Sequence, residues 1–105
     1  MSFTSVTVTG TSVLPNAGVA IGSVTFQPSD EMRNGGVIVP AAPVTVTLDG
    51  TGHFSIGLWA NDDSATLPTG TSYTVTEDLG AEVRTYNVVI PSASGTVDLS
   101  TLAHI

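Results

Sequence analysis

Two alternating runs joined by a glycine-rich turn fill residues 44–59, VTVTLDGTGHFSIGLW. Apolar residues take every second position on both sides of the turn, which is the period of a β-strand with one buried and one solvated face. The intervening Asp49-Gly50-Thr51-Gly52 favours a tight turn, because glycine tolerates a positive φ. This stretch predicts a β-hairpin, and it makes an all-β domain the expected fold class.

The same alternation returns in the rest of the chain. The further runs are Val6 and Val8; Val19, Ile21, Val24 and Phe26, with one break in phase; Tyr73, Val75, Glu77 and Leu79; Tyr86, Val88 and Ile90; and Val97 and Leu99. Together with the two runs in residues 44–59 they amount to about seven strands, spaced as in a β-sandwich. We therefore expect a single antiparallel β-sandwich, its strands filled by β-branched residues.

Proline and glycine mark the connections between the runs. The segments Pro15-Asn16-Ala17-Gly18 and Leu79-Gly80-Ala81-Glu82 are predicted turns, and the second is expected to close another hairpin. Residues 28–43 and 60–72 are predicted surface loops, because they are rich in proline, glycine and short polar residues. Within the first loop, Val37-Ile38-Val39 has the composition of a short edge strand.

The C-terminal segment has the spacing of a short helical turn. Asp98 or Ser100 is suited to cap such a turn, in which Leu99, Leu102 and Ile105 share one face. We favour a tail packed on the rim of the sandwich over an exposed interaction peptide.

The length and composition fit one domain. At 105 residues, with 41% hydrophobic and 10% charged residues, residues 1–105 are expected to form a single compact unit. The net charge of −7 disfavours binding to nucleic acid or to an anionic membrane surface. No run approaches the roughly 20 apolar residues of a membrane span, and the N-terminal residues alternate like a strand instead of forming a signal peptide. We expect neither a nucleic-acid nor a membrane partner.

Several residue types that carry chemistry are missing or isolated. The chain has no cysteine, which excludes disulfides, a thiolate metal site and a thiol nucleophile. It also has no lysine for an isopeptide cross-link to Asn or Asp. Its histidines, His53 and His104, lack a nucleophile motif or a spaced carboxylate beside them. We predict a non-enzymatic protein without a cofactor or a metal.

Trp59, the only tryptophan, opens a segment of amide and carboxylate side chains. Continuing the alternation of residues 54–58 places the indole on the outer face of its strand. An exposed aromatic ring beside such groups suits a sugar ring or a partner protein, so Trp59, Asn61, Asp62 and Asp63 form a candidate binding site. Two alternatives stay open: Trp59 caps the rim of the sandwich, or the loop carboxylates bind calcium without the spacing of an EF-hand.

The order and spacing of several short motifs resemble a known family. The motifs VTVTGT at 6–11, PNAGV at 15–19 and VTFQP at 24–28 resemble the start of carboxypeptidase-regulatory-like, or prealbumin-like, β-sandwich domains. The later motifs are similar to a module in minor tail proteins of bacteriophages that infect actinobacteria: VTVTLDGTGHFS at 44–55, ANDD at 60–63, LPTG at 67–70, YTVTED at 73–78, RTY at 84–86 and GTVDL at 95–99. The resemblance covers nearly the whole chain, from Val6 to about Leu102.

The resemblance implies a prealbumin-like or Ig-like sandwich and a place on a phage particle. In the tail proteins the module is one segment of a longer chain, so a chain with this module alone is expected to attach to a larger lattice. We expect a virion structural protein on the outer surface of the particle, either a capsid decoration or a minor capsid protein. Its partners would be the major capsid protein and other copies of itself. The alternatives are a minor tail, baseplate or tail-fibre accessory protein bound to tail proteins, and a carbohydrate-binding module for a surface glycan.

Overall fold

The computed structural model describes residues 5–13, 18, 21–62, 66–80, 82–92 and 95–104. Their regular structure is nearly all β. The elements are β1 (Ser5–Thr11), β2 (Ser23–Pro28), β3 (Met32–Asn34), β4 (Val37–Val39), β5 (Val44–Thr47), β6 (His53–Trp59), β7 (Tyr73–Asp78), β8 (Val83–Val88), β9 (Thr96–Asp98) and the 3₁₀ turn η1 (Leu99–Thr101). No helix in this described part has the length and apolar character of a membrane span.

The strands form two larger sheets and one separate hairpin. A three-stranded sheet has the order β6-β1-β9, a four-stranded sheet has the order β5-β2-β7-β8, and β3 pairs with β4. All these neighbours are antiparallel except β1 and β9, which run parallel. The parallel pair departs from the predicted wholly antiparallel sandwich. It arises because the chain enters β9 from β8 in the other sheet, so no tight hairpin sets the direction of β9.

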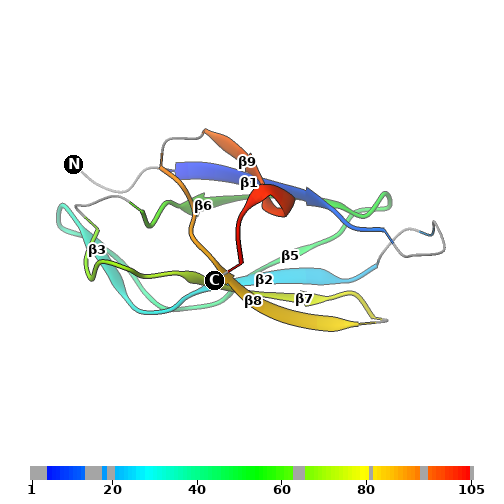
Figure 1. The fold of residues 1–105 in the computed structure, drawn as a ribbon, viewed down its shortest axis with the longest axis horizontal. Helices are drawn as coiled ribbons and strands as arrows, with labels where there is room; N and C mark the ends of the chain where they lie inside the picture. Colours follow the sequence, from blue (N-terminus) through cyan, green and yellow to red (C-terminus); the bar gives the residue numbers. More distant parts are fainter. Residues whose placement is uncertain are drawn as a thin grey trace.

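Side chains from both sheets fill one core, an arrangement compatible with a β-sandwich (Figure 1). The rings of Phe26 on β2 and Phe54 on β6 meet across the sheets with their centroids 6.1 Å apart. The buried apolar residues are Val6, Val8, Val24, Phe26, Met32, Leu48, Phe54, Leu58, Ala60, Tyr73, Val75, Val88, Ile90 and Leu99. The body is elongated, measuring 46 × 22 × 20 Å along its principal axes.

The described residues contain nine strands, not the predicted number of about seven. The two additional strands form the β3–β4 hairpin inside the predicted loop 28–43. The edge strand predicted at residues 37–39 is confirmed as β4. Its partner β3 escapes prediction because Met32 is the only apolar residue in that three-residue strand, so no alternation is visible.

The turn predicted at residues 49–52 is confirmed, but the hairpin predicted around it is not. The Gly52 amide donates to the Asp49 carbonyl at 3.0 Å, and the Asp49 amide donates to the His53 carbonyl at 2.9 Å. Beyond this turn the strands part, because β5 pairs with β2 while β6 pairs with β1. An alternating pattern reports which face is buried and does not report which strand is the neighbour.

The strand predicted to include Ile21 begins later than expected. Ile21 precedes β2 and is 78% exposed. The reason is Gly22, whose φ of +143° breaks the extended chain immediately before Ser23. Val19 and residues 15–17 of the first predicted turn lie outside the described residues.

The hairpin predicted around residues 79–82 is confirmed. Strands β7 and β8 pair, and the Leu79 amide donates to the Glu82 carbonyl at 2.9 Å. Ala81 itself lies outside the described residues.

The predicted C-terminal turn is present as η1. Asp98 caps it, since the Asp98 carboxylate accepts from the Ser100 amide at 2.9 Å and from the Ser100 hydroxyl at 2.7 Å. Leu99 is buried, and Leu102 packs against the core, so the tail lies on the rim of the two sheets. Ile105 lies outside the described residues.

Acid is expected to weaken the turn at Asp49. The carboxylate accepts hydrogen bonds from the Thr51 hydroxyl and amide and from the His53 amide, and these bonds hold the pKa of Asp49 below its ordinary value. Because the group is more acidic when folded, its contribution to stability exists above the unfolded pKa of about 3.9 and is lost as the pH falls through the folded pKa. Urea unfolding at about pH 6 and about pH 3 measures this loss. The loss should be larger for the wild type than for Asp49→Asn, and equal losses contradict the assignment.

Candidate functional site

Trp59 ends β6 at the edge of the three-stranded sheet and is 41% exposed, on the outer face as the alternation predicts. Beside it lies a mostly apolar groove of about 230 Å³. The residues that line this β5–β6 groove are Pro28, Val39, Pro40, Ala42, Val44, Gly57, Leu58, Trp59 and Tyr73. The aromatic residue singled out in the sequence therefore borders a concave apolar surface.

The groove follows from the way the two sheets separate. β5 and β6 leave their shared turn and become edge strands of different sheets. Where β5 begins and β6 finishes, away from this turn, Val44 and Trp59 both remain exposed. The Tyr73 hydroxyl of the opposite sheet donates to the Trp59 carbonyl at 2.7 Å, and burial raises the pKa of Tyr73 to about 12. The phenol stays protonated at neutral pH and ties the end of β6 to the other sheet.

The structure does not bring Asn61 to the surface beside Trp59. Asn61 is only 5% exposed. Its side-chain amide donates to the Thr71 carbonyl at 2.7 Å, and its side-chain oxygen accepts from the Ile90 amide at 2.7 Å. The side chain thus joins two neighbouring segments and has both its polar ends occupied by backbone.

Asp62 is exposed and accepts a hydrogen bond from the Ser92 amide at 2.7 Å. Asp63 lies outside the described residues. Among the residues that the structure does describe, no three histidine, cysteine or carboxylate side chains gather as metal ligands would. Of the four predicted site residues, Trp59 and Asp62 face solvent and Asn61 faces the interior.

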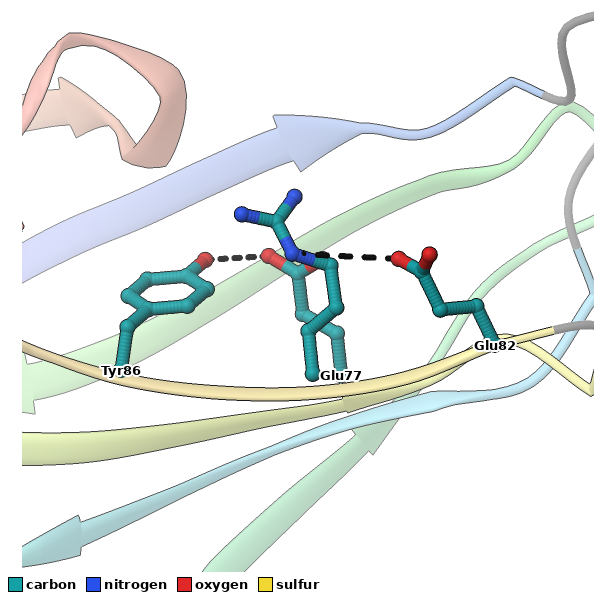
Figure 2. Close-up of polar contacts among 4 residues, drawn as sticks. Glu77, Glu82 and Tyr86 are labelled. Carbon is teal, nitrogen blue, oxygen red and sulfur yellow. Dashed lines mark hydrogen bonds and ion pairs between the residues drawn. The ribbon is translucent and has the colours of Figure 1, made fainter.

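A second, polar cleft of about 300 Å³ lies between the ends of the two sheets, and the sequence interpretation missed it. Its lining residues are Gly10, Thr11, Ser12, Phe54, Glu77, Arg84, Tyr86, Asp98, Leu99, Ser100 and His104. Figure 2 shows three side chains that rise on the same side of the sheet. They are Glu77 on β7, Tyr86 on β8, and Glu82, which immediately precedes β8. The Tyr86 hydroxyl donates to the Glu77 carboxylate, and the Arg84 Nε lies 3.8 Å from the Glu82 carboxylate.

Tyr86 is the centre of this cleft. The Arg84 guanidinium carbon lies 5.7 Å from the centroid of the Tyr86 ring, and the His104 ring stacks on Tyr86 with centroids 3.8 Å apart. Burial, then the hydrogen bond to Glu77, raises the pKa of the Tyr86 phenol, so it acts as a fixed donor and not as a base. The stack holds the C-terminal tail against β8. This arrangement fastens the tail across the seam between the sheets.

The signal for this cleft was present in the alternation. Glu77 is in phase with the buried Tyr73 and Val75, and Arg84 is in phase with Tyr86 and the buried Val88. Charged residues at positions that continue an inward-facing run predict that the core gives way to a polar cavity at that end of the strands.

Comparison with protein-family models gives no match, and comparison with curated proteins gives no relative at a significant level of similarity.

Proposed function

We propose that this protein is a non-enzymatic structural protein of a bacteriophage particle, attached to the outer surface as a capsid decoration or minor capsid protein. The observation that best supports an attachment role is the β5–β6 groove, with the exposed ring of Trp59 at its border. Large aromatic residues beside apolar pockets are the usual anchors of protein interfaces. The placement on a phage particle rests on the motif resemblance.

The groove suits an extended segment of a partner. It runs between β5 and β6, which are both edge strands, and edge strands carry backbone groups that a further strand can pair with. Side chains of an added strand would find the apolar lining of the groove. We infer that the major capsid protein supplies such a segment.

The strand order argues against an Ig constant-type version of the fold. In an Ig constant-type domain the first, second, fifth and fourth strands share one sheet. When the β3–β4 hairpin is left aside, the first strand here shares its sheet with the fourth and the last, β6 and β9. The second strand lies in the other sheet. This order departs from that of an Ig constant-type domain.

The structure supports the two alternative functions to different degrees. A tail, baseplate or tail-fibre accessory protein would use the same β5–β6 groove to bind a tail protein. The copy number in purified particles separates the two locations, since a capsid protein scales with the major capsid protein and a tail protein does not. A carbohydrate-binding module is less well supported, because Asn61 has its amide committed to backbone partners.

Replacing Trp59 by alanine is expected to weaken attachment to particles by about 30-fold or more, the effect of losing an interface anchor worth at least about 2 kcal/mol. The measurement is rebinding of purified protein to particles stripped of it. Trp59→Phe should recover part of the affinity, because it restores an aromatic ring at the groove.

Val13→Ala is the matched control, since Val13 is also exposed and lies away from the groove. Circular dichroism should show that all three variants remain folded. Unchanged rebinding of Trp59→Ala would remove the groove from the attachment surface. If the wild type neither rebinds nor co-purifies with particles, the virion role fails.

A further inference from the structure

The β3–β4 hairpin lies at one end of the elongated body (Figure 1). Together with Leu67 it forms a surface with several exposed apolar side chains. Arg33 and Leu67 exchange backbone hydrogen bonds of 2.8 Å in both directions, which joins Leu67 to the hairpin. Val37, Ile38 and Leu67 are exposed, and Ile38 is 60% exposed. We call Arg33, Val37, Ile38 and Leu67 the hairpin tip. It surrounds an open concavity of about 450 Å³.

Arg33 is an unusual residue to find in this position. The chain has only two basic residues against nine acidic ones. The other, Arg84, lies beside Glu82, whereas Arg33 is exposed and has no ion pair among the described residues. An arginine within an exposed apolar patch is a common composition for the centre of a protein interface. The hairpin tip therefore fits a partner surface that offers apolar side chains together with a carboxylate.

The opposite end of the body offers that combination. Ile21 and Val83 are exposed there, at 78% and 62%, beside the exposed carboxylates of Asp78 and Glu82. Ser23 of β2 pairs with Asp78 of β7, which in turn pairs with Val83 of β8, so these residues share one end of the four-stranded sheet. We call Ile21, Asp78, Glu82 and Val83 the far end. Figure 1 shows the β7–β8 turn and the β3–β4 hairpin at opposite ends of the long axis.

We propose that copies of this chain associate head to tail, with the hairpin tip of one copy seated on the far end of the next. The contact would place Arg33 against Asp78 or Glu82 while Ile38 and Leu67 cover Ile21 and Val83. A second copy is the occupant because its far end has the complementary charge and apolar residues. Since the two surfaces differ, the contact is heterologous and builds rows or rings in place of a closed two-fold dimer.

The head-to-tail contact specifies the surfaces of the self-association that the proposed function includes. It rests on the proposed function only for its location on a phage particle. Each surface has few apolar residues, so the interface falls in the small class below about 1,200 Å² and its affinity is weak in solution. On a particle the copies are held close together, and a high effective concentration makes a weak contact sufficient.

Sedimentation velocity of the purified protein, from about 10 μM to about 1 mM, tests the proposal. The wild type should show a sedimentation coefficient that rises with concentration. Arg33→Glu makes the tip repel the acidic far end, and Ile21→Arg removes an apolar contact and adds a cation that competes with Arg33 for the carboxylates, so each variant alone should stay monomeric. Both substitutions are at exposed side chains, which leaves folding intact.

The mixture of the two variants is decisive. The intact tip of Ile21→Arg meets the intact far end of Arg33→Glu, so mixing should restore association. Trp59→Ala, which alters neither end, should associate like the wild type, whatever its effect on particle binding.

Three results would overturn head-to-tail association. The first is a wild type that stays monomeric throughout the range. The second is continued dimerisation of Ile21→Arg alone, which indicates tip-to-tip contact. The third is a mixture that fails to associate although the wild type does. None of these three results depends on rebinding to particles, so the rebinding experiment tests the attachment role independently.

Discussion

Replacing Gly22 by alanine is expected to lower the free energy of unfolding by about 3 kcal/mol. A Cβ atom at this position would lie 1.9 Å from the carbonyl oxygen of Asp78, and Gly22 has a φ of +143° that alanine rarely adopts. The obstructing atom belongs to the backbone of β7, so relief requires β2 and β7 to move apart. Thermal unfolding should show the change as a decrease in Tm of roughly 10–20 °C.

The same substitution at Gly57 is the matched control. Gly57 lies on β6, and an added Cβ would meet nothing within 4 Å. Because glycine in a strand costs conformational entropy, Gly57→Ala should leave stability unchanged or raise it by up to about 1 kcal/mol. Equal destabilisation by the two substitutions would show that the contact at Gly22 has no special role.

The alternation of apolar and polar residues predicted the inward-facing side chains of most strands, although Ile21 and Val44, which continue two of these runs, are exposed. It located the strands of both larger sheets, the outward face of Trp59 and the turn at residues 49–52. These features depend on the two-residue period and on turn chemistry, both of which are local.

Features that depend on strands elsewhere in the sequence could not be predicted from the alternating pattern. The separation of β5 and β6 into different sheets is decided by their pairing with β2 and β1, which lie elsewhere in the sequence. The strand β3 exists because Val37–Val39 pairs with it and Leu67 bridges to Arg33, not because its own residues alternate. Contacts of this kind leave no periodic signal in the strand that receives them.

The candidate site shows the same division between local and distant information. An amide and carboxylate segment after an exposed tryptophan resembles a binding loop in sequence, yet Asn61 turns inward. What directs it inward is a pair of backbone groups at Thr71 and Ile90, which lie 10 and 29 residues further along the chain. Buried backbone groups require such partners, and a short polar side chain supplies them.

Asn61→Ala is accordingly expected to destabilise the fold by about 2–4 kcal/mol, because it leaves two buried backbone groups without their partners. The Ile90 amide loses its acceptor and the Thr71 carbonyl loses its donor. Urea unfolding monitored by circular dichroism measures the loss as a lower midpoint at an unchanged slope. Asp62→Ala is the neighbouring control, and its exposed bond to Ser92 should be worth no more than about 1 kcal/mol.

The pair of substitutions also separates a structural role for Asn61 from a role in recognition. If Asn61 only joins two segments, its removal reduces binding only by unfolding part of the protein. The molecules of Asn61→Ala that remain folded should then keep full affinity for particles or glycans. If Asn61→Ala instead unfolds at the wild-type midpoint and loses a ligand that Asp62→Ala retains, Asn61 contacts that ligand directly. Its two backbone bonds would then have to open during binding, and the assignment of the amide as a structural tie would be wrong.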